Sequence, residues 1–331
     1  MKRLLRIEDA AALNAWPVRP GLPAFEAGNL RRHAPDSHWV LLDEEGMIAG
    51  RCSLWWKSVP HHPGHRLGLV GHYATDTAEA AQLLLNQACE ELKANRCTLA
   101  VGPMDGNTWR HYRFVTESNG APPFFLEPAQ PPDWPRQFTR HGFEPLATYF
   151  SAVDERLEQE TDEQAGRAAA RVDRLGVALR PIRMDRFETE LRAIHAVVTA
   201  SFQGGFLYQP LSEAEFVAEY LPIRPYVRPE LVLLAEHGGR VVGFVFAVPD
   251  VLQARAGQSI DTAIIKTLAI LPERALAGLG SHLVATTRRS ARALGFRRLI
   301  HALMHESSKS RGISARYATL FRRYTLFAQA L

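Results

Sequence analysis

A strand that turns through a glycine loop into a helix, between Ile264 and Leu294, constrains this chain more than any other stretch. Gly278 and Gly280 remove side chains at the turn, so backbone N–H groups can point outward where the helix dipole adds partial positive charge. Such a loop can bind a phosphate or pyrophosphate without a metal, although an ordinary tight turn can have the same two glycines. It is not a P-loop, because no Gly-Lys-Ser/Thr is present, and Leu283 stands where G-x-G-x-x-G requires its third glycine.

Strands and helices alternate around this loop. Before the loop, the spacing of apolar residues predicts a strand over 177–182, a helix over 187–202, a helix that begins after Ser212, and a hairpin of strands over 230–236 and 241–248. It then predicts a strand over 263–270 that leads into the loop. A helix over 281–294 and a strand over 298–304 follow the loop. Ser212 and Glu215 predict a capping box at the second helix. This order is typical of an α/β fold.

The first half has a similar order of strands and helices, but the elements at the start of that order are missing, so its front is truncated. Its pattern predicts strands over 39–42, 48–55, 66–73, 98–101 and 145–153, and helices over 77–95 and 133–141. The connection at 74–80 that leads into the first of these helices contains no glycine, and Asp76 and Glu79 would repel an anion there. We expect two domains in the 331 residues, 1–153 and 175–331, joined by a helical linker over 154–174.

The composition is that of a soluble globular protein, with 46% hydrophobic residues and no apolar run near the roughly 20 residues of a membrane span. The N-terminus lacks the apolar stretch of a secretory signal, so we expect a cytoplasmic location and reduced cysteines. The formal charge of +4 comes from scattered basic residues, which does not favour nucleic-acid binding. His61, His62 and His65 lack a suitably spaced carboxylate or Cys, so we expect no metal site.

The run from Thr267 to Val284 resembles the cofactor motif of the GNAT acyltransferase superfamily. The family pattern is Val/Ile-x-Pro, followed by Arg/Gln-x-x-Gly-x-Gly/Ala. Four positions fit this pattern: Ile270, Pro272, Gly278 and Gly280. The Arg/Gln position holds Ala275, with Arg274 one residue before it. The order of elements around the motif is also that of the family, so the resemblance covers residues 175–331.

The resemblance implies two GNAT-like α/β domains in tandem, each a mixed, mostly antiparallel sheet flanked by helices, with the first domain degenerate. It implies direct transfer of an acyl group from acetyl-CoA or another acyl-CoA to an amine of a small molecule or peptide. The main chain would pair with the pantetheine arm at Leu268, Ala269 and Ile270. The pyrophosphate would meet loop amides and one guanidinium, at Gly278, Leu279, Gly280, Ser281 and Arg274.

The resemblance leaves the catalytic groups open. Many family members carry a Glu on the strand before the motif, but Lys266 stands close to that position here. Glu273 or Glu306 acting through water could replace this base, or both could be solvated surface carboxylates. Tyr317 lies where the family often has its acid, although Ser308 replaces a common Asn. Lys266 could anchor an acidic substrate, or extend from a strand edge into solvent.

A segment rich in turn formers and aromatic residues follows the strand at 98–101. Four of its residues could line a cleft that faces the second half and binds the acceptor: Asn107, Trp109, Arg110 and Arg113. Alternatively, this segment is a long loop that packs its aromatic side chains on its own domain. The resemblance therefore implies an N-acyltransferase, with a non-catalytic CoA- or acyl-CoA-binding sensor or scaffold as the alternative.

Overall fold

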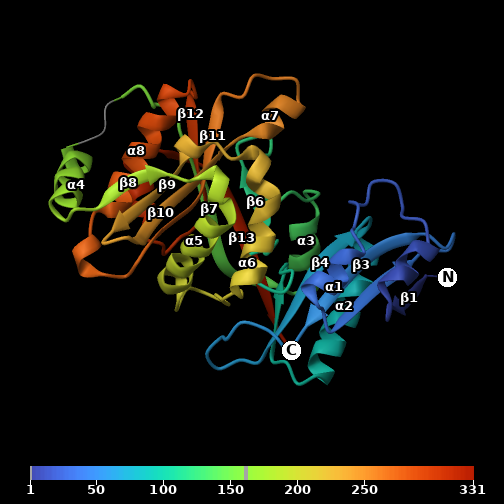
Figure 1. Ribbon diagram of the computed structural model, residues 1–331. Helices are drawn as coiled ribbons and strands as arrows, with labels where there is room; N and C mark the ends of the chain where they lie inside the picture. The colour runs from blue at the N-terminus through green and yellow to red at the C-terminus, as the bar shows by residue number, and fades with distance from the viewer. Residues whose placement is uncertain (1, 160–162) are drawn as a thin grey trace.

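The computed structural model describes residues 2–159 and 163–331, and within them thirteen strands form one continuous mixed sheet. Figure 1 shows the two halves of the chain side by side along this sheet. The predicted fold class, α/β with a mixed sheet flanked by helices, is confirmed.

The first half contributes seven of the strands described. They are β1 (Arg3–Arg6), β2 (Ser37–Leu42), β3 (Ile48–Trp55), β4 (Leu67–Thr75), β5 (Leu99–Gly102), β6 (Phe114–Ser118) and β7 (Glu144–Asp154). Its helices are the 3₁₀ helix η1 (Ala10–Ala15), α1 (Gly28–His33), α2 (Ala78–Ala94) and α3 (Trp134–His141).

The second half contributes the other six strands. They are β8 (Ala178–Pro181), β9 (Val232–His237), β10 (Arg240–Pro249), β11 (Thr262–Ile270), β12 (Arg298–His305) and β13 (Thr319–Ala330). Its α-helices are α4 (Glu163–Arg174), α5 (Phe187–Phe202), α6 (Glu213–Tyr220), α7 (Val251–Arg255), α8 (Leu279–Ala293) and α9 (Ser310–Ser314). Its 3₁₀ helices are η2 (Met184–Arg186), η3 (Leu221–Tyr226), η4 (Pro229–Leu231) and η5 (Arg274–Leu276). The capping box at α6 is present, and α4 forms the last part of the predicted linker, of which residues 160–162 lie outside the described residues.

The two halves exchange their last strands. β7, at the end of the first half, pairs antiparallel with β12 of the second half. β13, at the end of the chain, pairs antiparallel with β5 of the first half and with β7, and β6 adds to it as a branch. The sheet order is therefore β1-β2-β3-β4-β5-β13-β7-β12-β11-β10-β9-β8. Backbone hydrogen bonds along β5, β13, β7 and β12 thus join the halves and leave no strand edge between them.

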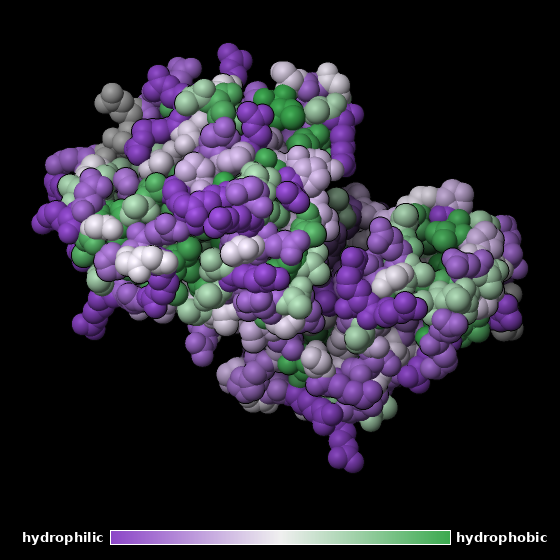
Figure 2. Space-filling model, in the orientation of Figure 1, coloured by the Kyte–Doolittle hydropathy of each residue, from purple (hydrophilic) through white to green (hydrophobic). Residues whose placement is uncertain are grey.

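Apolar residues alternate along the strands of the second half, so the two faces of its sheet are buried under different helices. Val245 and Ile265 pack in one core with α8, whereas Phe244 and Phe246 pack in another with α5. In the first half α2 covers the sheet through its buried apolar face. Figure 2 shows hydrophilic residues over much of the visible face of both halves. No helix in the described ranges is long and apolar enough to cross a membrane.

The prediction that the front of the first half is truncated is wrong. Arg3–Arg6 forms β1, which pairs antiparallel with β2, and η1 and α1 occupy the stretch before β2. β1 has only four residues, none of them buried, and neither η1 nor α1 has a fully buried residue. Elements this short and this exposed carry too little hydrophobic periodicity for a sequence pattern to reveal them.

The strand exchange predicts that neither half folds alone. A fragment of residues 1–159 has β7 without its neighbours β12 and β13, and a fragment of 163–331 has β12 and β13 without β7. We expect each fragment to be unfolded or aggregated when expressed separately, and the co-expressed pair to copurify as one folded complex. Size-exclusion chromatography and circular dichroism check this. Two stable monomeric fragments would contradict it.

Candidate active site

β11 and β12 form a parallel pair that opens part of the way along. Their pairing ends at Ile265↔His301, beyond which β11 stays with β10 while β12 stays with β7. The sheet therefore splits into a V with residues 266–270 on one arm and 302–305 on the other. Main-chain groups on a strand with a neighbour on one side only can pair with an extended ligand.

A β-bulge directs Lys266 into this V. The register of β11 against β10 skips one residue between Ile265 and Thr267, and that residue is Lys266. Its ammonium donates a hydrogen bond to the carbonyl oxygen of Leu126 at 3.3 Å. The side chain is reached from the V but otherwise surrounded by protein, so it points inward rather than from a strand edge into bulk solvent.

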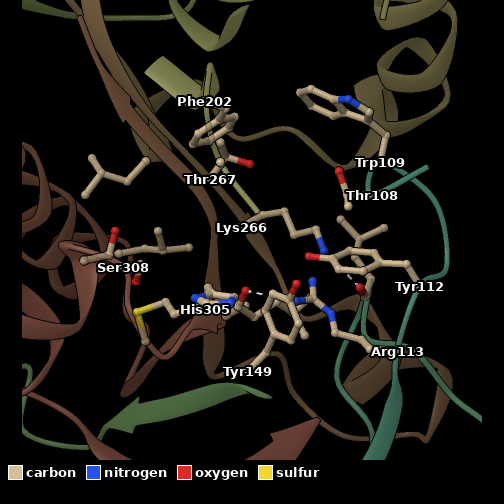
Figure 3. A pocket seen from close by; sticks show the side chains of 18 of the residues that line it. Thr108, Trp109, Tyr112, Arg113, Tyr149, Phe202, Lys266, Thr267, His305 and Ser308 are labelled. Carbon is tan, nitrogen blue, oxygen red and sulfur yellow. Dashed lines mark hydrogen bonds between the residues drawn. The ribbon is translucent and has the colours of Figure 1, made fainter. Parts of the chain in front are cut away.

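The V opens into a cavity of about 730 Å³, a volume typical of ligand-binding sites. Both halves of the chain line this cavity, as Figure 3 shows for part of its wall. The first half contributes, among others, Asp105, Thr108, Trp109, Arg110, His111, Tyr112, Arg113, Leu126, Glu127 and Tyr149. The second half contributes, among others, Phe202, Phe206, Tyr208, Glu219, Tyr220, Lys266, Thr267, Leu268, His301, Leu303, Met304, His305, Ser307 and Ser308.

A buried carboxylate holds the first-half loop at 119–133 over the cavity. Glu127 accepts hydrogen bonds from the Arg322 guanidinium and from the Tyr324 hydroxyl, both on β13. The Glu127 and Arg322 side chains are almost completely inaccessible to solvent. The Phe125 N–H donates to Asp250 Oδ1 at 2.9 Å, which ties the same loop to the second half. The strand exchange thus positions the loop from which Leu126, Glu127 and Pro128 line the cavity.

The N-terminus of α8 lies beside the arm of the V that β11 forms. Gly278 has φ +95° and precedes α8, whose first turn contains no acidic residue. A Cβ added at Gly280 would lie 2.9 Å from Ile270 Cδ1, so the bare glycine lets the helix approach β11 closely. Arg316 donates to Ser281 Oγ at 2.8 Å. The first amides of a helix lack intrahelical partners, so this end combines free donors with positive charge.

Aromatic rings hold the polar groups of the opposite wall. The Arg113 guanidinium carbon lies 4.0 Å from the ring centroid of Tyr112 and 4.2 Å from that of Tyr149. The His305 ring lies edge-on to Tyr149 with centroids 4.9 Å apart, and its Nδ1 lies 2.7 Å from Ser307 Oγ. Partial burial, helped by the nearby Arg113 charge, lowers the pKa of His305. Its imidazole is therefore neutral at neutral pH. The Ser307 N–H donates to Nδ1 at 3.1 Å, so the ring proton lies on Nε2 and a second proton can be taken up only at Nδ1, beside the Ser307 hydroxyl.

Four of the five predicted acceptor-binding residues line the cavity: Trp109, Arg110, Arg113 and Lys266. Trp109 also packs on the second half, since its indole N–H donates to the Gln209 carbonyl at 2.9 Å. Asn107 is buried away from the cavity, where its Oδ1 accepts from the Trp109 N–H at 3.0 Å. Of the predicted co-substrate residues, Leu268 lines the cavity, while Ala269, Ile270, Arg274, Gly278, Leu279, Gly280 and Ser281 lie along the same arm and at the start of α8.

None of the three predicted catalytic residues lines the cavity. Glu273 pairs with Arg240 at 2.6 Å on the surface, and Glu306 pairs with Arg323 at 2.6 Å. The Tyr317 ring is buried, with the Arg288 guanidinium carbon 4.3 Å from its centroid. The structure instead brings His305, Tyr112 and Tyr149 to the cavity. Of these, His305 had one weak signal in the sequence, a histidine at the end of a strand before a serine-rich loop.

The corresponding strand pair of the first half, β4 and β5, is filled by the chain itself. Their pairing ends at Leu69↔Val101, and the Met104 N–H then bonds to the Val70 carbonyl at 2.8 Å. Met104 is fully buried, and a Cβ added at Gly71 would lie 2.2 Å from the Met104 carbonyl oxygen. Segment 102–106 therefore occupies the space that the V leaves open in the second half. Within residues 2–159 and 163–331, no cluster of three or more His, Cys, Asp or Glu could hold a metal ion.

Removing the charge of Glu127 should destabilise the whole protein. Glu127→Gln leaves the buried Arg322 guanidinium without its carboxylate, and breaking a buried pair in this way costs about 3 to 5 kcal/mol. Glu273→Gln breaks an exposed pair with Arg240 and should cost about 1 kcal/mol or less. Urea unfolding monitored by fluorescence compares the two variants. Equal effects would show that the buried pair is not a major anchor.

Residues 193–312 match the model of the acetyltransferase (GNAT) family. This segment includes the V, the glycine loop and the start of α9. No curated protein matches the sequence.

Several solved structures share the fold over the whole chain. A probable N-acyltransferase of unknown function from Enterococcus faecalis is 9% identical, with a TM-score of 0.57 over 100% of this chain and 73% of its own. A tandem GNAT protein from the clavulanic acid biosynthesis pathway is 11% identical, with a TM-score of 0.52 over 100% of this chain and 98% of its own. A glucosamine N-acetyltransferase region in a fungal multi-domain β-N-acetylglucosaminidase is 12% identical, with a TM-score of 0.55 over 99% of this chain, which spans only 38% of that protein. The chain therefore has the fold of tandem GNAT proteins, and its residues 193–312 match the model of the GNAT acetyltransferase family.

Proposed function

We propose that this protein is an acyl-CoA-dependent N-acyltransferase that transfers an acyl group, of which acetyl is the simplest, directly to an amine. The observation that carries this proposal is the opening of β11 from β12 beside the glycine loop at the start of α8. An extended ligand arm in the V and an anion at the helix N-terminus together fit an acyl-CoA. The first half has no comparable opening in the residues described, which supports a single co-substrate site.

In this proposal the pantetheine arm pairs with the main chain at Leu268, Ala269 and Ile270. The pyrophosphate binds the amides of Gly278, Leu279, Gly280 and Ser281. Arg274 and Arg316 lie near this end of α8, and each can supply the charge that Ala275 cannot. The acyl group then reaches the cavity near Lys266, where both halves of the chain contribute side chains.

The reaction requires a neutral amine, which attacks the thioester carbonyl carbon while the carbon–sulfur bond breaks. We assign the base to His305, because its imidazole lines the cavity and burial keeps it neutral. The proton that the amine loses passes through the Ser307 hydroxyl to His305 Nδ1, 2.7 Å away, and the imidazolium returns it by the same route to the departing thiolate before CoA leaves. The Ser308 hydroxyl lines the cavity and is buried without a hydrogen-bond partner among the residues described, so it can donate to the reacting oxygen or sulfur.

The wall that faces the V fits an amine with an apolar body. Trp109, Phe202 and Tyr208 pack against one another with ring centroids 6.0 to 6.4 Å apart. Arg110 pairs with Glu219 at 3.5 Å beside them. We therefore propose that the acceptor binds between the segment at 108–113 and the helices α5 and α6, with its amine directed toward His305.

A carboxylate placed at the start of α8 should prevent acyl-CoA binding. Ser281→Glu introduces a negative charge among the amides that would meet the pyrophosphate, and the same charge stabilises the helix N-terminus, so the fold is kept. We expect acetyl-CoA affinity measured by calorimetry to fall by at least about 100-fold, equivalent to roughly 2.7 kcal/mol. Ser290→Glu, later on the same helix, is the control. If Ser281→Glu bound acetyl-CoA like the wild-type protein, the assigned pyrophosphate site would be wrong.

Loss of the imidazole should slow the transfer without weakening acyl-CoA binding. For His305→Gln we expect kcat to fall by about 100-fold or more, as is usual for a lost general base, with acetyl-CoA affinity unchanged. In the wild-type enzyme the pKa of His305 lies below its ordinary value of 6.5, so kcat/KM should rise with pH below 6.5 and level off at neutral pH. The variant should lack this rise. Free-thiol release over an amine panel measures both effects.

Two outcomes would count against these assignments. An unchanged kcat in His305→Gln would exclude His305 as the base. Binding of acetyl-CoA by the wild-type protein, with no thiol release for any amine, would favour a non-catalytic acyl-CoA-binding protein instead.

A further inference from the structure

Two cations in the cavity wall have no carboxylate partner among the residues described. Lys266 donates only to the Leu126 carbonyl, and Arg113 donates through Nη1 to the Leu303 carbonyl at 3.3 Å. The Nε of Arg113 is buried with no hydrogen-bond partner in the same described residues. Buried charges in proteins are usually paired, so two unpaired cations on one wall are costly unless a ligand compensates them.

Figure 3 shows the Lys266 amine and the Arg113 guanidinium converging beside the Tyr112 ring. The two charges influence each other. Burial, together with the Arg113 charge, lowers the pKa of Lys266 to about 7, although the Glu127 carboxylate acts to raise it. An anion between them would remove this repulsion and hold Lys266 in its charged form.

The carboxylates of the cavity are already engaged. Glu127 is buried against Arg322 and Tyr324, and Glu219 pairs with Arg110 at 3.5 Å. Asp105 Oδ1 accepts from the His72 N–H at 2.6 Å, and its Oδ2 lies 4.0 Å from His72 Nε2. None of these groups therefore serves as the counter-ion of Lys266 and Arg113.

We infer that the transfer site binds a carboxylate of one of its substrates between Arg113 and Lys266. A carboxylate fits better than a phosphate, because the described part of the wall supplies only these two cations without a carboxylate partner, Arg110 being paired with Glu219. Tyr112 and Tyr149 hold the Arg113 guanidinium between their rings, so it is pre-organised to receive an anion.

This inference rests on the proposed function and specifies its substrate class. The carboxylate belongs either to the amine acceptor, as in an amino acid, or to the acyl group, as in a dicarboxylic acyl-CoA. The wall around Trp109 and Phe202 is open to an apolar or aromatic body in both cases.

Calorimetry without any acyl-CoA tests the site directly, with acetate, succinate and 3-phenylpropionate as probes. We expect at least one probe to bind the wild-type protein, and Lys266→Met and Arg113→Gln each to weaken it by about 30-fold or more, which corresponds to roughly 2 kcal/mol for a lost charged partner. Lys57→Met is the matched control, because Lys57 is exposed and pairs with Asp36 outside the cavity. Circular dichroism spectra and melting temperatures close to those of the wild-type protein show that the variants are folded.

Turnover identifies the source of the carboxylate. If the acceptor supplies it, acetyl-CoA should react faster with phenylalanine than with phenethylamine, which lacks the carboxylate, and Lys266→Met should remove this preference. If the acyl group supplies it, phenethylamine should react faster with succinyl-CoA than with acetyl-CoA. Lys266→Met should then remove this preference for succinyl-CoA.

Failure of this inference can be separated from failure of the proposed function. If acetyl-CoA binds but no carboxylate probe binds, or if the probes bind equally well to Lys266→Met and Arg113→Gln, the carboxylate site is overturned and the transferase proposal stands. If the probes bind as expected but no acyl-CoA does, the anion site stands and the transferase proposal fails.

Discussion

The backbone hydrogen bonds of β7 and β13 are the interaction on which the rest of the structure depends. Each strand leaves its own half and completes the sheet of the other, so one ladder runs from β5 through β13 and β7 to β12. β13 also carries Arg322 and Tyr324, which hold Glu127 and the loop at 119–133. That loop supplies the carbonyl of Leu126 that Lys266 reaches. The exchange therefore joins the two halves of the chain and builds a cavity to which both contribute.

Local features of this fold could be predicted from the sequence. The helix at 187–202, the capping box at Ser212 and the loop at Gly278 follow from apolar spacing, side-chain capping and glycine, all of which act over a few residues. The partner of β13 could not be predicted, since an alternating pattern specifies a strand face but not its neighbour. The tail around 322–327 had no assigned place before the sheet order showed it at the centre.

The candidate site shows the same division between local and tertiary information. Motif positions such as Gly278 and Gly280 are visible in the sequence because they are adjacent. Trp109 and Arg113 stood out only as an unusual cluster, and their contact with the second half depends on the exchanged strands. Only its position at a strand end marked His305 in the sequence, because the role proposed for it depends on the neighbouring Tyr149 ring and on burial. Lys266 is visible in the sequence as a departure from the family pattern. The bulge that turns its side chain inward depends on how β11 pairs with β10, which is a tertiary feature.

The proposed function requires that an acyl-CoA bind in the V between β11 and β12. Hydrogen–deuterium exchange of the wild-type protein with and without acetyl-CoA tests it, because main-chain amides that pair with the ligand exchange more slowly. Binding in the V should give new protection at residues 266–270 and 278–282, and little change at the filled β4 and β5 pair. Protection confined to the first half, or no change in either stretch at saturating acetyl-CoA, would contradict it.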